Sequence, residues 1–335
     1  MDTRTLDNLT IWQPDNQRGH VESYFLKLND PAQNRALWLK FTLYCPKGKP
    51  AETVGECWGI AFDSADGSKT AAFKETYPVA GCKLARTAFD LDFNGNILQE
   101  GVTKGKLKGP AGDLSWDLTF TPGAESFSLF PLPWMYTAKL PKSKIKTPHP
   151  SSLFSGSYTL NGVTVKVNGV RGMQGHNWGS EHSHLYAWAH CSDFEGYGDD
   201  TYFEGFSGKI KVGPWVSPFM NMAVLQLRGK RYVWNGLKAI RSEKIRVETN
   251  RWQFEIEGKE NRLVGSILAP KDHFIGLHYY NPKGEVSYCL NSKVSAGEIQ
   301  LLTPDGKVIE SLRTKQSFAL EVLVKDPSHG IRMGA

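Results

Sequence analysis

Short runs of β-branched and aromatic residues, separated by Gly, Pro, Asn and Asp, recur along the whole chain, whereas helical periodicity is nearly absent. Early runs are Val21–Leu28, Ala36–Tyr44 and Cys57–Phe62. Runs of this length and composition are typical of antiparallel strands joined by tight turns. Hairpin turns are predicted at three dipeptides that accept a positive φ, namely Asp66-Gly67, Asn94-Gly95 and Asn161-Gly162.

The second half of the chain continues this pattern without repeating the sequence. The strands predicted there are His184–Cys191, Thr201–Val212, Asn221–Leu227, Tyr232–Leu237, Lys244–Val247, Trp252–Ile256, Leu263–Leu268, Gly276–Tyr280, Val286–Asn291, Glu298–Thr303 and Gln316–Val324. Roughly eight strands in each half are enough to close a small barrel. We therefore expect an all-β protein with two antiparallel barrels in tandem, over residues 1–180 and 181–335. The length of 335 residues agrees, because it exceeds one ordinary core.

Two stretches interrupt the strand pattern. The Pro-rich passage from Phe130 to Pro150 breaks the series, and Lys139–Lys146 within it is interpreted as a solvated linker. The Gly-rich segment Arg171–Glu181 is predicted to be a loop that joins the two halves.

Composition narrows the class of protein. No run of about 20 apolar residues occurs, so no membrane-spanning helix is expected. The N-terminus lacks the apolar stretch of a signal peptide. Five scattered cysteines, an odd number without a CxxC pair, fit a reducing compartment. We therefore expect a soluble, cytoplasmic protein.

The charge balance bears on partners. A net charge of +6 permits peripheral contact with an anionic membrane surface. Nucleic acid is not an expected partner, because the basic residues form no stripe along the chain. The sequence leaves the oligomeric state open.

The segment with the most potential chemistry is Arg171–Cys191, which holds four histidines and two tryptophans. If its last part is a strand, alternate side chains share a face. One face then carries His184, Tyr186, Trp188 and His190, and it is suited to line a pocket for an apolar ligand. The opposite face is small and apolar, as for packing against a neighbouring sheet or domain: Leu185, Ala187, Ala189 and Cys191.

The next predicted strand presents Tyr202, Glu204 and Phe206 on one face. If the carboxyl group is buried between the two aromatic rings, desolvation raises its pKa. It could then stay protonated near neutral pH and act as a general acid. The alternative is that the aromatic residues only pack across strands and that Glu204 faces solvent.

A metal site is the rival interpretation of the histidines. His182 and His184 are two residues apart, and His176 and His190 could complete a three-histidine zinc site. The segment has no HExxH motif, and we expect no metal. The chain also lacks the GxSxG motif of a catalytic nucleophile, so nucleophilic catalysis is not indicated. It has neither a Walker loop nor a GxGxxG that opens a helix, and no nucleotide or other cofactor is expected.

At Gly175–Gly179 (GHNWG) and Tyr186–His190 (YAWAH), the chain resembles the two-domain lipocalin-like superfamily of carotenoid 1,2-hydratase (hydroxyneurosporene synthase), the AttH-like proteins, tocopherol cyclase and certain fungal pericyclases. Their shared mark is a His-x-Trp-Gly signature near the junction of two calycin-like barrels. The resemblance therefore implies that both predicted barrels are lipocalin-like. The first barrel of these proteins often opens with Glu-Trp-Trp-Tyr, whereas Glu22–Phe25 (ESYF) lacks the tryptophans.

The resemblance also implies site residues. His176 and Trp178 match the first pair used by the hydratases, and Tyr202 and Glu204 match a later Tyr-x-Asp, with Glu in place of Asp. The implied mechanism begins when Glu204 or a histidine protonates an isoprenoid double bond. Aromatic faces then stabilise the carbocation by roughly 0.5–2 kcal/mol each, without a cofactor.

Two functional hypotheses follow, and both have a hydrophobic small molecule as partner. One is a cofactor-independent hydratase, cyclase or isomerase, and the other is a non-catalytic lipocalin-like carrier or stress protein. A buried Glu204 that faces a closed pocket with Trp178 favours the enzyme, and an exposed one favours the carrier. The predicted catalytic residues are Glu204, His176 and Tyr202. The predicted ligand-binding residues are Trp178, His184, Tyr186, Trp188, His190 and Phe206.

Overall fold

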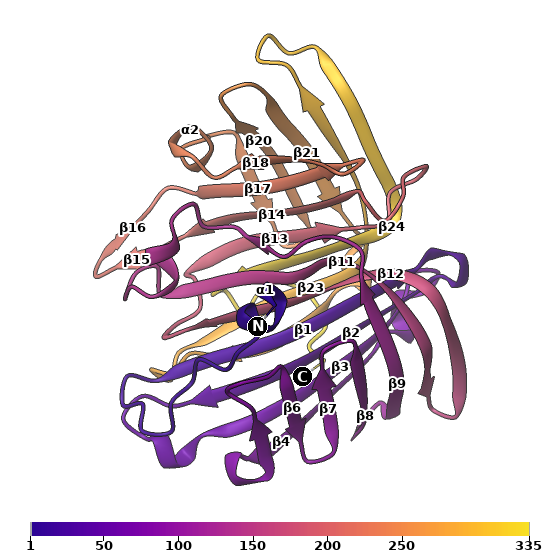
Figure 1. Ribbon diagram of the computed structural model, residues 1–335, viewed down its shortest axis with the longest axis vertical. Helices are drawn as coiled ribbons and strands as arrows, with labels where there is room; N and C mark the ends of the chain where they lie inside the picture. The colour runs from indigo at the N-terminus through magenta and orange to yellow at the C-terminus, as the bar shows by residue number, and fades with distance from the viewer. Residues whose placement is uncertain (1, 335) are drawn as a thin grey trace.

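The computed structural model describes residues 2–334 and places most strands in two large antiparallel sheets, one below the other in Figure 1. Sheet A has twelve strands from residues 20–179, and sheet B has ten strands from residues 185–324. The predicted all-β architecture is therefore confirmed. The predicted division into domains at residue 180 falls between the two sheets and stays a prediction about folding units.

The elements have the following bounds. Sheet A contains β1 (His20–Asp30), β2 (Arg35–Cys45), β3 (Val54–Asp63), β4 (Ala71–Pro78), β5 (Cys82–Leu84), β6 (Asp90–Phe93), β7 (Asn96–Gln99), β8 (Val102–Gly109), β9 (Gly112–Pro122), β10 (Phe127–Ser128), β11 (Ser143–Leu160) and β12 (Val163–Gly179). Sheet B contains β13 (Leu185–Cys191), β14 (Tyr202–Lys209), β17 (Met220–Leu227), β18 (Lys230–Trp234), β19 (Ile245–Glu248), β20 (Arg251–Glu257), β21 (Arg262–Leu268), β22 (Ile275–Tyr280), β23 (Val286–Leu302) and β24 (Val308–Val324). A separate two-stranded arm is formed by β15 (Lys211–Val212) and β16 (Trp215–Val216). The helices are α1 (Thr3–Asp7) and α2 (Leu237–Ile240), with 3-10 turns η1 (Pro31–Gln33), η2 (Pro50–Glu52), η3 (Gly67–Lys69), η4 (Val79–Gly81), η5 (Pro133–Tyr136) and η6 (Lys271–His273).

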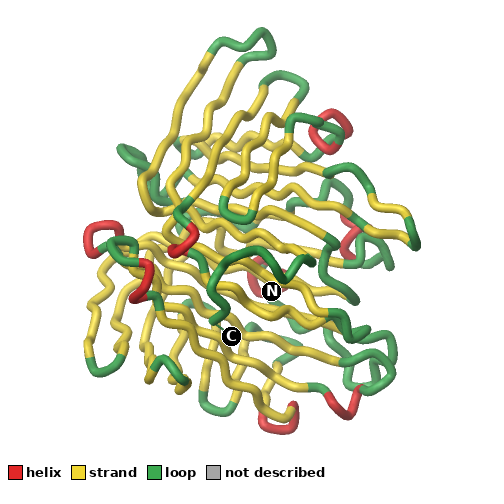
Figure 2. The backbone as a smooth tube through the Cα atoms, turned by 180° about the vertical axis from the view of Figure 1, so that it is seen from behind, coloured by secondary structure: helices red, strands yellow, loops and turns green. Residues whose placement is uncertain are grey.

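Both sheets are strongly curved. Sheet A has the order β4-β3-β2-β1-β12-β11-β9-β8-β7-β6-β5, and β4 packs back against β8, which nearly closes a barrel (barrel A). Sheet B has the order β18-β17-β14-β13-β24-β23-β21-β20-β19, and β17 approaches β20 (barrel B). The helices are few and short (Figure 2). None within residues 2–334 is long and apolar enough to cross a membrane.

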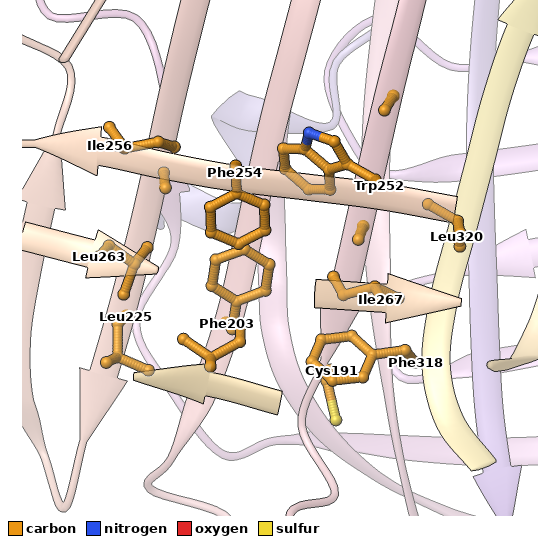
Figure 3. Close-up of a cluster of buried hydrophobic side chains, with 14 of the residues drawn as sticks. Cys191, Phe203, Leu225, Trp252, Phe254, Ile256, Leu263, Ile267, Phe318 and Leu320 are labelled. Carbon is orange, nitrogen blue, oxygen red and sulfur yellow. The ribbon is translucent and has the colours of Figure 1, made fainter. Parts of the chain in front are cut away.

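Each barrel has its own apolar interior. In barrel B, Phe203 and Phe254 stack with ring centroids 5.8 Å apart, beside Trp252 (Figure 3). The barrels meet through their outer faces, where the ring of Phe25 on β1 packs edge-on against Trp188 on β13 at 5.7 Å. The interface between the barrels is thus a third apolar layer, separate from both cores.

Two of the three predicted hairpin turns are confirmed by positive φ angles. Asn94 and Gly95 have φ of 56° and 90°, and Asn161 and Gly162 have φ of 51° and 80°. The third turn differs, because Asp66 accepts a hydrogen bond from the Ser68 backbone at 3.1 Å and begins the 3-10 turn η3. A capped helical turn therefore replaces the expected two-residue hairpin.

The predicted loop Arg171–Glu181 is wrong, because β12 continues to its end at Gly179. The glycines of this segment permit close approach of neighbouring chains. A Cβ atom at Gly172 would lie 2.1 Å from the carbonyl oxygen of Lys27, and one at Gly175 would lie 2.4 Å from the ring of Phe25. Glycine inside a strand can mark such an approach as well as a turn.

The predicted linker Lys139–Lys146 is wrong in its second half, where β11 begins at Ser143 and continues past both Pro148 and Pro150. The pairing of β11 with β12 shifts register around His149, so the prolines occupy an irregular stretch that needs no regular ladder bonds. The apolar stem of Lys144 is buried in this strand. The prolines and lysines of this stretch are typical of loops, so the sequence pattern did not predict the first part of β11.

Candidate functional site

A cavity lies between the outer faces of the two barrels. Its walls are largely aromatic, with charged groups at a few positions. Lining residues from sheet A include Phe25, Trp38, Lys40 and Lys144. Lining residues from sheet B include Tyr186, Trp188, Phe206, Tyr279 and Glu321.

Strand alternation directs these side chains into the cavity. On β2, Trp38 and Lys40 lie on the outer face, while Leu39 and Phe41 point into the core of barrel A. Phe25 on β1 lies directly opposite Lys40 in the strand register. The cavity wall is therefore built by residues that alternate with core residues along the same strands.

Lys40 is a buried lysine that lines the cavity. The residue is 4% exposed, and its Nζ atom lies 3.9 Å from the ring centroid of Tyr279, with Trp58 and Trp38 at 5.9 and 6.0 Å. No carboxylate of residues 2–334 is within ion-pair distance of Lys40. Burial lowers the pKa of Lys40 from 10.5 to about 8, because an amine loses hydration when it is charged in an apolar site.

His182 stands beside the same aromatic ring. Its imidazole lies 5.1 Å from the Tyr279 ring centroid, at an interplanar angle of 30°. Burial, followed by the charges of Lys40 and Lys325, lowers the pKa of His182 to about 3. The ring is therefore neutral at physiological pH and can donate or accept a hydrogen bond.

Glu321 supplies the negative charge of the cavity, and it is already paired. Its carboxylate lies 2.7 Å from the Nζ atom of the fully buried Lys293, which also contacts Asn291 at 2.5 Å. The hydroxyl of Tyr186 points to the same carboxylate at 3.5 Å. Burial raises the pKa of Tyr186 well above its usual value, so its hydroxyl remains a donor. Among residues 2–334, Lys40 and Lys144 are thus the cations of the cavity without a carboxylate partner.

The cavity opens through a wider, more polar mouth. Phe130, His182 and Phe206 line both spaces, so the two are continuous. The charged residues that line the mouth are Lys142, Glu181, Lys211, Lys283, Glu285 and Lys325. Glu181 pairs with both Lys142 and Lys283, so the mouth carries a surplus of positive charge.

The predicted ligand-binding residues divide into two groups. Tyr186, Trp188 and Phe206 line the cavity, and His184 lines its mouth. The other predicted site residues border neither space: His176, Trp178, His190, Tyr202 and Glu204. Sequence reasoning missed Lys40, whose only signal was a lysine between Leu39 and Phe41 in a largely apolar strand.

His176 belongs to a buried cluster around Glu22 instead. Its Nε2 atom lies 3.0 Å from the Glu22 carboxylate, and its Nδ1 atom lies 2.7 Å from the backbone oxygen of Asp7. Both ring nitrogens therefore face oxygen atoms that can accept a hydrogen bond. The ring stacks on Tyr24 at 4.2 Å and contacts Trp178 at 4.8 Å. This arrangement fastens the N-terminal segment to β12.

Glu204 is fully buried, as the enzyme hypothesis requires, but it joins the two barrels and faces neither the cavity nor Trp178. Its carboxyl group accepts hydrogen bonds from Thr147 of β11 at 2.7 Å and from the indole of Trp188 at 3.0 Å. Burial raises the pKa of Glu204, and both hydrogen bonds oppose the rise. Tyr202, on the same face, packs in a cluster that includes Phe127.

His190 also connects the barrels, because its Nε2–H donates to the backbone oxygen of Pro150 at 2.7 Å. The predicted alternation on β13 is confirmed, but the small face packs inside its own barrel and it is the aromatic face that meets the other barrel. Ala187, Ala189 and Cys191 pack inside barrel B, and the aromatic face meets barrel A. The small residues leave room for the large rings of the barrel B core.

No group of three His, Cys, Asp or Glu side chains in residues 2–334 is placed to hold a metal ion. His182 and His184 lie before β13 begins and are not on a regular strand face. They border the cavity and its mouth without a carboxylate or thiol partner.

No family model matches the chain. An uncharacterised protein of Mycobacterium tuberculosis, in strains CDC 1551 and H37Rv, is 22% identical over 287 residues, which cover 84% of this chain and 82% of that protein.

Three solved structures are similar over nearly the whole chain. An AttH-like protein from Nitrosomonas europaea has a TM-score of 0.56 and 13% identity, and covers 95% of this chain and 97% of its own. CghA, crystallised with Sch210972, has a TM-score of 0.56 and 11% identity, over 92% and 89%. Kievitone hydratase from Nectria haematococca has a TM-score of 0.51 and 10% identity, over 96% and 95%.

The two curved sheets define an all-β protein of two lipocalin-like barrels that pack side by side. The particular fold is the one shared with the AttH-like protein, CghA and kievitone hydratase. The expected two-barrel, lipocalin-like fold is therefore confirmed.

Proposed function

We propose that the protein binds a hydrophobic small molecule in the inter-barrel cavity and acts on it as a cofactor-independent acid–base enzyme of the hydratase, isomerase or cyclase type. The observation that carries this proposal is Lys40, an amine without a carboxylate partner in an aromatic cavity. One of the proteins with the same fold is a hydratase by name, and this supports the hydratase type.

The cavity walls support the binding part of the proposal. Sites for small ligands are mostly apolar and carry a few polar groups. The cavity walls have this composition, and the rings of Phe25, Trp38 and Trp188 supply flat apolar surface. Tyr186 and His182 supply hydrogen bonds that would orient a polar group of the ligand.

Lys40 supports the catalytic part. A pKa of about 8 lies near physiological pH, where a general acid or base works best. In its ammonium form Lys40 would stabilise negative charge that develops on a ligand oxygen. For water addition to an enone, the water oxygen bonds to the β-carbon and the π pair moves to the carbonyl oxygen, which takes the ammonium proton. The Lys40 amine then takes the surplus proton of the water, and the enol becomes a ketone.

The charge of the cavity favours this route over a carbocation. Lys40 and Lys144 raise the local potential, and Glu321 is neutralised by Lys293 at 2.7 Å. A positive site disfavours a developing cation and favours a developing oxyanion. We therefore propose a hydrophobic substrate that bears a carbonyl, enol or phenol oxygen. An isoprenoid skeleton with such an oxygen fits the same walls.

The second candidate function is a non-catalytic carrier of a lipophilic ligand. The observation that favours it is the position of Glu204 and His176, the two residues that the resemblance implies for acid chemistry. Both are bound to protein partners and border neither the cavity nor its mouth.

A paired experiment separates the two functions. Native mass spectrometry and solvent extraction identify the ligand that co-purifies with the protein, and turnover of that ligand is then measured from pH 6 to 10. For an enzyme, kcat/KM falls as pH rises through about 8, because the Lys40 ammonium is lost. Lys40→Met lowers kcat/KM by about 100-fold or more, and kcat/KM of this variant no longer falls as pH rises through about 8.

The matched control is Lys74→Met. Lys74 also lies over the Trp58 ring, at 4.2 Å, but it pairs with Glu56 and borders neither space. It should leave turnover and the pH profile unchanged. A bound ligand that is never converted identifies a carrier. If kcat/KM of Lys40→Met still falls as pH rises through about 8, the assigned role of Lys40 is contradicted.

A further inference from the structure

Two segments frame the mouth of the cavity. Phe130, Pro141 and Lys142 line it from the passage between β10 and β11, and Lys211 and Gly213 line it from the β15–β16 arm. The arm and the η5 passage project on the same side of the molecule in both Figure 1 and Figure 2. Any ligand that reaches the cavity through this mouth passes between them.

The exposed tryptophans of the protein lie on these two segments. Eight of the ten tryptophans are buried, whereas Trp134 and Trp215 are 58% and 59% exposed. Leu132, Leu140 and Val216 add exposed apolar side chains on the same segments. The two exposed indole rings thus belong to the two segments that line the mouth.

The charge of the two segments is entirely positive. Residues 130–146 and 207–219 contain no Asp or Glu. Lys139 and Lys211 are exposed and have no ion pair among residues 2–334, and Lys209 lies 4.7 Å from the ring of Phe219. We use the name mouth surface for Leu132, Trp134, Lys139, Leu140, Lys211, Trp215 and Val216.

Tryptophan and lysine together suit one surface in particular. Indole rings prefer the headgroup level of a bilayer, where one edge is apolar and the other is hydrated. Lysines near an anionic leaflet are attracted to its headgroups. We infer that the mouth surface docks on an anionic lipid bilayer, so that the cavity opens toward the membrane. The further step, in which the ligand enters from the bilayer, rests on the proposed function.

Vesicle sedimentation tests the docking without any ligand. The full-length protein is mixed with phosphatidylcholine vesicles with and without phosphatidylglycerol, at low and high salt. We expect binding only to the anionic vesicles, weakened by salt. Trp134→Ser and Trp215→Ser should each lower the partition coefficient about tenfold. Lys139→Gln and Lys211→Gln should each lower it about fivefold.

Matched controls lie on the hairpin between β23 and β24, at the far end of barrel B in Figure 1. Ile309 is 51% exposed, and Lys307 is exposed. Ile309→Ser and Lys307→Gln should leave vesicle binding unchanged. Thermal unfolding of every variant shows whether each one is folded, since all four mouth positions are exposed and their replacement should not affect stability.

Three outcomes overturn the inference. Equal binding to neutral and anionic vesicles would show that the lysines do not direct the docking. An equal loss of vesicle binding in the control variants would show that the mouth surface is not the docking site. Self-association that the tryptophan variants abolish, without vesicle binding, identifies a protein interface instead. Ligand extraction tests the cavity separately, so vesicle binding by a protein that holds no ligand leaves the docking intact and contradicts only the proposed function.

Discussion

At the scale of single residues, Glu22 is the most heavily bonded carboxylate of the protein. It is fully buried, and five donors point at its two oxygens, from the backbone of Ile11 and Trp12 and from the side chains of His20, Tyr24 and His176. Burial alone would raise the pKa of Glu22, but the hydrogen bonds and charges of the two histidines hold it well below the usual value. The histidine of the GHNWG motif thus serves here to fix the N-terminal segment.

Glu22→Gln should therefore destabilise the protein by about 3 kcal/mol at pH 7, since it leaves buried donors facing an uncharged amide. A depressed pKa in the folded state contributes stability that is present above the ordinary pKa of 4.5 and is lost as pH falls below it. The difference between wild type and Glu22→Gln should accordingly shrink below about pH 4.5.

Urea unfolding at pH 7 and at pH 3.5 measures this difference. Glu52→Gln is the control, because Glu52 makes only an exposed pair with Lys49 at 3.0 Å. If the difference in unfolding free energy between wild type and Glu22→Gln stays constant over this pH range, the ionised form of Glu22 does not stabilise the fold.

At the scale of elements, alternation and turn residues were sufficient for most strands and for the face pattern of β13. These patterns predicted a loop or linker in parts of β11 and β12, where glycine and proline lie inside a strand and do not end it. The glycines of β12 make room for β1, and Pro148 and Pro150 lie in an irregular part of β11. A single sequence cannot distinguish a glycine that turns the chain from one that lets another chain approach.

Gly172→Ala should destabilise the protein by about 1–3 kcal/mol, because the added Cβ would lie 2.1 Å from the backbone oxygen of Lys27 and β12 must shift. Thermal and urea unfolding measure the loss. Gly236→Ala is the control, since a Cβ there meets no atom within 4 Å. Equal stability of the two variants would mean that β12 does not pack tightly on β1.

At the scale of the whole molecule, the site is a product of how two barrels meet. The sequence indicated two barrels and several aromatic residues of the cavity, including Tyr186 and Trp188. It could not indicate Lys40 or Tyr279, because the contact between β2 and β22 joins distant parts of the chain. For the same reason it could not indicate that Thr147 and Trp188 hold the carboxyl group of Glu204 between the barrels, and the catalytic role of Glu204 stays a prediction.

Glu204→Gln should leave ligand turnover within about twofold of wild type, because the amide can accept from Trp188 and donate to Thr147. Glu204→Ala should instead cost about 2–4 kcal/mol of stability, since it leaves a void and two unpaired groups. Turnover and unfolding of both variants check this. A stable Glu204→Gln protein with turnover lowered about 100-fold would return Glu204 to a catalytic role.

The position of the cavity has a consequence for how such proteins diverge. Its walls are outward-facing residues, and the strands that carry them keep their inward-facing residues for two separate cores. Replacements in the wall can therefore reshape the cavity while both cores stay intact, because strand alternation separates the two sets. The fold itself tolerates wide sequence change, since this chain shares it with three solved structures at 10–13% identity.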